Sequence, residues 1–382
     1  MKIKKTIFTA AILMAAVCLP AQNKSAGINI SIWKDICTQP HDSTQTTYVN
    51  IGLLSTMNRL NGLGINALGS VVHGDMNGVQ ITGLANLAGG TMRGVQLAGI
   101  SNISGNNTVG LSAAGLVNIT GDKTQGVIIS GLTNIGGDDT SGLMISGLMN
   151  VTGNMASGLH CSGVANITGQ NFGGVMVSGL LNVVGEHMNG LQIAGIANIT
   201  ASKLNGVQVA LCNYATQARG LQIGLVNYYK EDMKGFQLGL VNANPETRVQ
   251  MMLYGGNATP ANIGVRFKNR LFYTILGVGS MYQGLNDKFS ASASYRAGLS
   301  VPLYKGLSVS GDVGYQHIET FDNKDEVIPK RLYALQARVN LEYQITGKFG
   351  IFATGGYGLT RFYHQSINYD KGAIIEAGIV LF

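Results

Sequence analysis

The residues of this chain that could perform chemistry are few and scattered. No two of the six histidines have the spacing of a metal site; they are His41, His73, His160, His187, His317 and His364. The signatures HExxH, CxxC and GxSxG are absent, and no glycine forms a phosphate-binding loop with Lys-Ser/Thr. The sequence therefore predicts no enzyme, no metal site and no cofactor.

Acidic residues could act as catalytic groups or as calcium ligands. Parallel β-helices host carbohydrate-active enzymes, whose sites need two or three converging carboxylates. The repeated part of this chain contains no clustered column of Asp or Glu, and Asp138-Asp139 and Glu231-Asp232 do not recur once per repeat, as calcium-binding repeats require. A carbohydrate-active β-helix is therefore kept only as an alternative to a non-catalytic function.

The third group of candidate residues consists of charged side chains in the C-terminal part, where each alternates with apolar neighbours. These are Arg266, Arg296, Asp312, Arg338, Glu342 and Glu376. Alternation with a period of two places them on one face of extended strands. We expect them to share the interior of a barrel as a paired polar network with a packing role.

The elements that precede this segment are built from a 16-residue repeat. Its leading glycine occurs at Gly78, Gly94, Gly110, Gly126, Gly142, Gly158, Gly174, Gly190 and Gly206, with a degenerate first copy at Gly62 and two shortened copies at Gly220 and Gly235. A period this short and strict indicates a repeat architecture. About ten coils, at roughly 4.8 Å each, would form a rod on the order of 50 Å long.

Each column of the repeat, numbered from the leading glycine, has its own residue type. Positions two, four, seven and ten are aliphatic, and position six is glycine from Gly83 to Gly195. Position nine is asparagine, at Asn86, Asn102, Asn118, Asn134, Asn150, Asn166, Asn182 and Asn198. A β-solenoid is predicted, with a bend at positions five and six that turns the aliphatic columns inward, and with Cys161 at position four as a core residue. Parallel stacking would align the asparagines, so that their amides bond along the axis.

An alternative fold treats each repeat as one strand of a single large membrane barrel. A strand of 10 to 12 residues suits a tilted barrel strand. The copies almost entirely lack aromatic residues, however, and the shortened copies would invert the strand parity. This alternative would make the protein a porin-like channel.

The N-terminal residues indicate export. Residues 1–21 have the basic start, apolar centre and small-residue end of a signal peptide. Its removal takes three lysines and leaves 23 Lys+Arg against 19 Asp+Glu, a net charge of about +4, which does not indicate nucleic-acid binding. Residues 22–61 hold two expected strands, at 28–33 and 48–54, that either cap the first coil or join the C-terminal sheet.

Residues 62–245 form the predicted repeat domain, and residues 246–382 are predicted to form an antiparallel outer-membrane β-barrel. Residues 333–343 show the pattern best, because Tyr333 and Tyr343 bound an apolar face whose opposite face is polar. The same alternation predicts about eight strands. A barrel of this size is filled by its own side chains, which favours an anchor over a pore.

The phrases Gly-Leu-Gln-Ile-Gly-Leu-Val-Asn (220–227) and Gly-Phe-Gln-Leu-Gly-Leu-Val-Asn (235–242) resemble those of the bacterial surface-repeat proteins of Bacteroidetes and spirochaetes. The resemblance covers roughly residues 62–245 and implies an outer-membrane or surface protein. We therefore expect a structural or adhesive repeat protein without catalysis, in contact with outer-membrane lipid and with a cell-envelope or surface ligand not specified by the sequence. With eight strands and a periplasmic C-terminus, the repeats are expected in the periplasm.

Overall fold

A computed structural model of the chain describes residues 25–34, 36–39, 45–282, 289–321, 331–363 and 368–382. It divides into two compact units, Met1–Gly220 and Leu221–Phe382. All regular elements of the described residues are β-strands, which confirms the predicted all-β class. None of these residues belongs to a helix that is long and apolar enough to cross a membrane. The predicted signal peptide lies outside the described residues.

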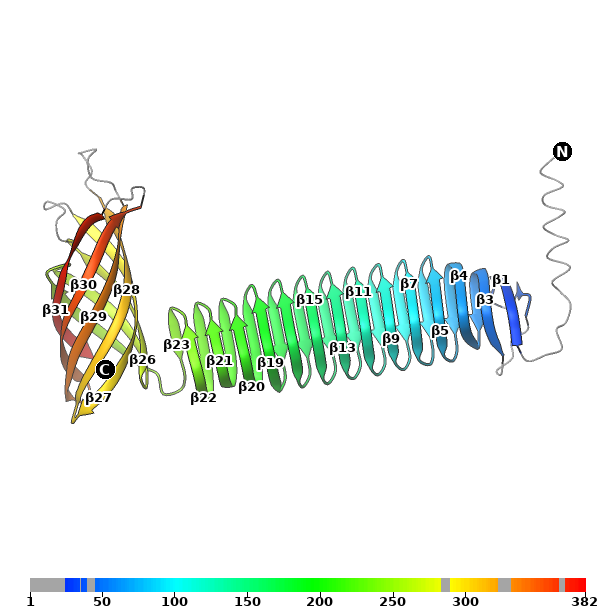
Figure 1. The fold of residues 1–382 in the computed structure, drawn as a ribbon, viewed down its shortest axis with the longest axis horizontal. Coiled ribbons are helices and arrows are strands. Elements are labelled where there is room, and N and C mark those ends of the chain that lie inside the picture. The colour runs from blue at the N-terminus through cyan, green and yellow to red at the C-terminus, as the bar shows by residue number, and fades with distance from the viewer. Residues whose placement is uncertain (1–24, 35, 40–44, 283–288, 322–330, 364–367) are drawn as a thin grey trace. The chain divides into compact units, whose positions relative to one another are not determined.

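The first unit is a stack of parallel coils, each built from one long and one short strand (Figure 1). The long strands are β5 (Met76–Thr82), β7 (Met92–Ala98), β9 (Thr108–Ala114), β11 (Thr124–Ser130), β13 (Thr140–Ser146), β15 (Ala156–Ser162), β17 (Phe172–Ser178) and β19 (His187–Ala194). The short strands are β6 (Ala85–Ala88), β8 (Ser101–Ser104), β10 (Val117–Thr120), β12 (Thr133–Gly136), β14 (Met149–Thr152), β16 (Ala165–Thr168) and β18 (Leu181–Val184). Two longer strands follow, β20 (Ala197–Val209) and β21 (Cys212–Ile223).

Equivalent strands pair in parallel, and each residue faces the residue 16 positions further on. Gly126 pairs with Gly142, for example, and Asn134 pairs with Asn150. This register confirms the solenoid and rules out the single large barrel.

The N-terminal strands continue the same stack. They are β1 (Ser25–Trp33), β2 (Ile36–Cys37), β3 (Thr46–Met57) and β4 (Arg59–Val72). Strand β1 pairs in parallel with β3, and β3 with β4, whereas the two-residue β2 pairs antiparallel with β1. Of the two arrangements expected for this segment, the structure therefore has the one in which it adjoins the repeats.

The predicted orientation of the aliphatic columns is wrong. In β13, Met144 is 1% exposed, whereas Ile145 is 37% exposed and Leu148, at the following corner, 44%. Positions three, five, nine, eleven and fifteen point inward, and positions two, four, seven and ten point outward. Alternation along a strand decides this, because the asparagine of position nine lies inside and its aliphatic neighbour at position ten must then lie outside. Cys161, at position four, is accordingly half-buried on the outer face and is not a core residue.

The coils approach one another too closely for side chains at two glycine columns. At position six, a Cβ on Gly131 would lie 2.0 Å from the carbonyl oxygen of Gly115. At position one, Gly142 has a φ of +119°, and its Cβ would lie 2.1 Å from the carbonyl oxygen of Gly126. Only glycine combines this backbone conformation with this separation. The glycine columns thus follow from the spacing of the coils.

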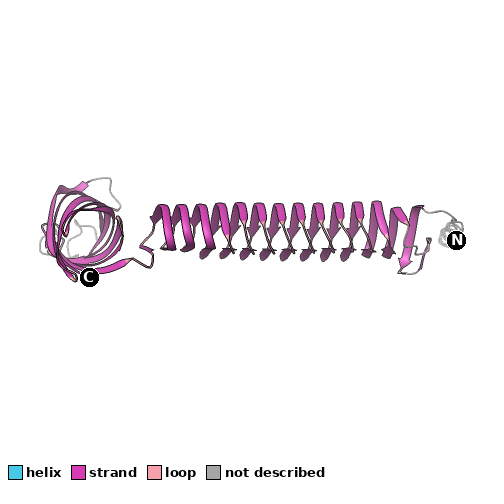
Figure 2. Cartoon of the chain, turned by 90° about the horizontal axis from the view of Figure 1, so that it is seen from below, coloured by secondary structure: helices cyan, strands magenta, loops and turns pink. Residues whose placement is uncertain are grey.

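The second unit contains β22 (Val226–Leu238), β23 (Val241–Ala243) and a closed barrel of eight antiparallel strands. Strands β22 and β23 retain the parallel pairing of the repeat, with Asn227 facing Asn242. The barrel strands are β24 (Arg248–Gly256), β25 (Ala261–Asn269), β26 (Phe272–Ser280), β27 (Ser290–Tyr304), β28 (Leu307–Thr320), β29 (Arg331–Thr346), β30 (Phe349–Phe362) and β31 (Asn368–Leu381). Pairing of β24 with β31 closes the ring, seen end-on in Figure 2. This confirms the eight-stranded barrel.

The outer wall of the barrel is apolar and has aromatic residues toward both ends. Exposed apolar side chains on it include Val249, Ile263, Val278, Leu299, Val313, Leu335, Val339, Leu341 and Ile375. Tyr304 and Tyr343 lie at the end with the short turns. Toward the other end, the ring of Tyr333 stacks on that of Tyr315 with centroids 6.2 Å apart and is tilted against that of Tyr363 with centroids 5.2 Å apart. An apolar band between two aromatic girdles is typical of membrane barrels.

Candidate functional site

All six charged residues predicted for the barrel interior lie there, and each is at most 6% exposed. Arg266 of β25 forms a two-pronged ion pair with Glu342 of β29; its Nη1 and Nη2 donate to the carboxylate oxygens at 2.6 and 2.9 Å. Its Nε also donates to Gln250 at 2.6 Å. Strands β25 and β29 are not neighbours in the barrel, so this pair connects opposite parts of the wall.

A second network joins the other four charged residues. Arg296 donates to both carboxylate oxygens of Asp312, at 2.8 and 2.7 Å, and its Nη1 lies 3.6 Å from Glu376. Arg338 donates to both oxygens of Glu376 at 3.1 Å. The three arginines and three acids of the two networks cancel in charge. Such a pairing is what buried charges require when water is excluded.

Apolar residues fill the lumen beside these networks. One buried cluster contains Ala258, Tyr282, Ile318, Leu332, Ala334 and Ile374, and another contains Met252, Tyr254, Tyr273, Ile275, Phe352 and Val380. Tyr273 donates to Asp312 at 2.8 Å and so joins the second cluster to the charged network. The interior is thus packed with side chains on both sides of the charges, as expected for eight strands.

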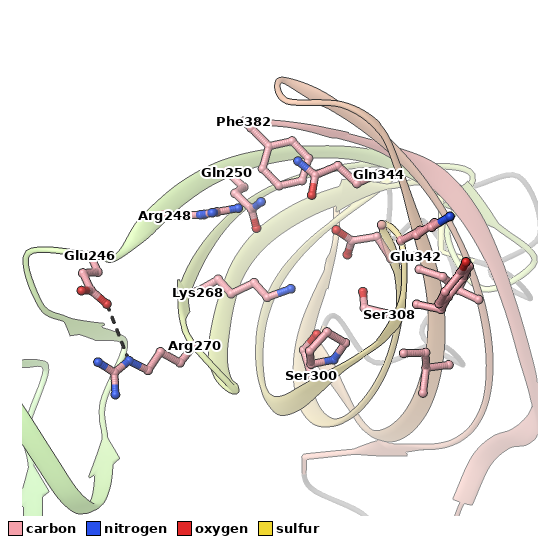
Figure 3. A pocket seen from close by; sticks show the side chains of 16 residues that line it. Glu246, Arg248, Gln250, Lys268, Arg270, Ser300, Ser308, Glu342, Gln344 and Phe382 are labelled. Carbon is pink, nitrogen blue, oxygen red and sulfur yellow. Dashed lines mark ion pairs between the residues drawn. The ribbon is translucent and has the colours of Figure 1, made fainter.

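A cavity of about 790 Å³ opens at the short-turn mouth of the barrel (Figure 3). Its wall includes Arg248, Lys268 and Lys305, and Lys268 points into the cavity. The two acids in the same wall already have partners, because Glu246 pairs with Arg270 at 3.6 Å and Glu342 pairs with Arg266. The cavity therefore has a positive field that suits an anionic group. Sequence reasoning missed it, because its cations come from separate strands and a turn and form no local motif.

The eight asparagines of position nine lie inside the solenoid and form one continuous column. Each Nδ2 donates to the Oδ1 of the next asparagine, at 2.8 to 3.0 Å from Asn86 to Asn198. The Nδ2 of Asn150 also donates to the carbonyl oxygen of Cys161 at 2.8 Å. The column extends beyond the predicted range to Asn213, whose Oδ1 accepts a hydrogen bond from Asn198 at 3.1 Å. Asn29, Asn50 and Asn66 form a separate amide ladder, in which Asn66 is in register with Thr82 at position five.

Two further pairs of buried amides were not predicted; they are separated by five copies of the repeat in which position three is not glutamine. At position three, Gln96 donates to Gln80 at 2.9 Å and Gln208 donates to Gln192 at 2.8 Å, all four being buried. The recurring glutamine beside aliphatic residues was a visible signal. Because the aliphatic residues at positions two and four face outward, the glutamine between them faces inward.

We expect Asn150→Ala to lower the free energy of unfolding by about 1–3 kcal/mol, because it leaves the amide of Asn134 without its acceptor inside the stack. The measurement is the urea midpoint of the full chain. Lys123→Ala is the control, since Lys123 forms an exposed pair with Asp139 at 3.2 Å and such pairs contribute little. Equal midpoints for the two variants would show that the column does not stabilise the solenoid.

His160 is the one histidine that the described solenoid buries; it occupies position three between Met144 and Met176. Its ring packs edge-on against Phe172 with centroids 5.0 Å apart, and its Nε2 has no hydrogen-bond partner among the described residues. Burial lowers the pKa of His160 from 6.5 to about 4. A lowered histidine pKa means that the folded state holds the neutral ring.

This burial predicts a pH-dependent stability that His160→Met should remove. The unfolded chain takes up the proton below pH 6.5 and the folded chain only below about pH 4, so stability falls between these values and levels off below them. At pH 4.5 the loss is about 2.5 kcal/mol relative to pH 7.5. The test compares the urea midpoints of the wild-type and His160→Met proteins at pH 4.5 and pH 7.5. Other titrating groups are the same in both proteins, so their contributions cancel. A midpoint difference that does not change with pH would contradict the lowered pKa of His160.

The remaining candidates do not converge. Among the described residues, no three His, Cys, Asp or Glu side chains are grouped so that they could hold a metal ion. Asp138 accepts a hydrogen bond from Asn154, and Asp139 pairs with Lys123, so both act within polar turns. Glu231 and Asp232 are exposed on β22, and His41 and His364 lie outside the described residues.

Comparison with known proteins adds little to this description. No protein-family model matches the chain, and no curated protein matches it. A solved structure that does match is the N-terminal β-barrel domain of Pseudomonas aeruginosa OprF, with 14% identity and a TM-score of 0.26, over 35% of this chain and 93% of that one. The likeness is weak, and the fold given above rests on the strand pairing alone.

Proposed function

We propose that the barrel anchors the chain in the outer membrane of a Gram-negative bacterium and that the solenoid is a structural or binding element without catalysis. The observation that carries the proposal is the filled, charge-balanced lumen inside an apolar wall. The wall suits lipid, and the packed lumen suits an anchor better than a channel.

Planar-bilayer recording of the purified full chain tests the anchor. The expected result is stable insertion without open-channel conductance steps, in membranes where a known porin serves as the positive control. Regular open-channel steps would overturn the anchor proposal in favour of a channel.

The strand count also supports a periplasmic position for the repeats. Both ends of an eight-stranded barrel lie on one side, and Arg248 near the start of the first strand and Phe382 at the C-terminus line the same mouth. That mouth also carries the short turn at Lys305 and Gly306, with φ of +34° and +86°, and short turns face the periplasm in such barrels.

A site-specific protease tests this topology. We would insert its recognition sequence into the exposed turn at Asp122 and treat cells that carry the protein. Cleavage is expected only after the outer membrane is permeabilised. Cleavage in intact cells would place the repeats on the cell surface.

A further inference from the structure

The outer face of the solenoid carries a continuous line of aliphatic side chains. Position seven forms the corner between the long and the short strand of each coil, and we call this line the apolar edge: Leu84, Ile100, Leu116, Leu132, Leu148, Val164, Leu180 and Ile196. All of these except Val164 are 39–51% exposed. The outward aliphatic columns at positions two, four and ten flank the edge on both sides. A contiguous apolar surface of this extent marks an interaction site.

The opposite corner of each coil is polar. Between residues 78 and 205, every Asp, Glu, Lys and Arg falls at positions 13, 14 or 16; they are Arg93, Asp122, Lys123, Asp138, Asp139, Glu186 and Lys203. Positions one to eleven contain none of these four residue types. The coil is therefore amphipathic in cross-section, with the apolar edge on one side and these polar turns on the other.

The backbone amides at the apolar edge are hydrogen-bonded to the neighbouring coil and do not depend on water for a partner. The amide of Ile100 donates to the carbonyl of Leu84 at 2.8 Å, and that of Leu116 donates to the carbonyl of Ile100 at 2.9 Å. The same bond recurs at each coil to Ile196. Backbone groups must be paired in this way before a segment can enter lipid at an acceptable free energy.

The side chains of the edge favour lipid over a protein partner. Specific protein interfaces concentrate aromatic residues and arginine as anchors in shaped pockets. The apolar edge has neither, only Leu, Ile and Val in a straight line about 34 Å long at the spacing of parallel strands. Acyl chains require apolar area and no shape complementarity, and the polar turns prevent the coil from being immersed completely.

We propose that the solenoid lies along a phospholipid surface, with the apolar edge among the acyl chains and the polar turns in water. The amphipathic cross-section fits an insertion depth of about 5–10 Å, as for other structures that lie in the interface plane. The inference rests on the proposed membrane anchor, because the barrel keeps the solenoid tethered to a bilayer.

Position-specific quenching in the full chain tests the proposal. In a background with Cys37, Cys161 and Cys212 changed to serine, we would introduce Leu148→Cys at the apolar edge and Lys123→Cys at a polar turn as the matched control. Each thiol is labelled with an environment-sensitive fluorophore and the protein is reconstituted in phosphatidylcholine vesicles. Lipid with a quencher on its acyl chain should remove most of the emission at position 148 and little at position 123.

Two outcomes overturn the proposal. Equally weak quenching by the lipid at the two positions, with position 148 open to an aqueous quencher, means that the edge is in water. Shielding of position 148 from an aqueous quencher without quenching by lipid means that a second copy or another protein surface covers it. If Leu148→Cys does not fold, native Cys161, on the outer column at position four, is labelled instead, with Cys37 and Cys212 changed to serine. Flotation of washed vesicles separates the two hypotheses: loss of the chain from vesicles contradicts the anchor, and retention with a water-exposed edge contradicts only the lipid contact.

Discussion

Replacing Arg296 by methionine is expected to lower the free energy of unfolding of the barrel by about 3–5 kcal/mol. The guanidinium of Arg296 forms two hydrogen bonds with Asp312, whose side chain is completely buried, and it also donates to Asn340 at 3.0 Å. Without it, the carboxylate of Asp312 keeps only the neutral donors Tyr273 and Asn340. An uncompensated charge inside the lumen is the source of the loss.

The barrel supplies a matched control on its own surface. Arg331 pairs with Glu319 at 3.1 Å, and the side chain of Arg331 is 64% exposed. Arg331→Met should therefore cost less than about 1 kcal/mol. Urea unfolding in detergent micelles, followed by the mobility shift of the folded barrel, gives both values. Equal losses for the two variants would show that burial of the network contributes nothing.

Replacing both Arg296 and Asp312 separates the contribution of charge to stability from that of packing. In the double variant Arg296→Met with Asp312→Leu, no charge of this pair remains, and part of the stability should return. Apolar replacement of a buried ion pair is often close to neutral. A double variant no more stable than Arg296→Met alone would assign the loss to shape and not to charge.

The barrel was the more predictable unit because its rule is local. Alternation with a period of two, read from residues such as Tyr333 and Tyr343, decides which side chains face lipid and which face the lumen. The pairing of Arg266 with Glu342 then follows from the need to neutralise buried charges. Which acid Arg266 pairs with could not be predicted, since Glu342 lies on a strand that is not its neighbour.

The period of the solenoid could be predicted from the sequence, but which columns of the repeat face inward was predicted wrongly. Aligned columns require parallel stacking, and both were read correctly from the sequence. The predicted bend at positions five and six placed the aliphatic columns inside, where burial of Leu and Ile would be favourable in water. The asparagine column already contradicted that assignment, since positions nine and ten cannot face the same side of one strand.

The largest effect in the solenoid is expected from Gly147→Ala, which should lower the free energy of unfolding by at least about 3 kcal/mol. Its Cβ would lie 2.0 Å from the carbonyl oxygen of Gly131 in the preceding coil, so the two coils must separate. Separation weakens the adjacent backbone bond from Leu148 to Leu132, now 2.8 Å long. Gly173→Ala is the control, because nothing lies within 4 Å of its Cβ, and it should be neutral or stabilising by about 0.4–1 kcal/mol. Urea midpoints of the full chain compare the two, and a Gly147→Ala protein as stable as Gly173→Ala would mean that the coils are not stacked at this distance.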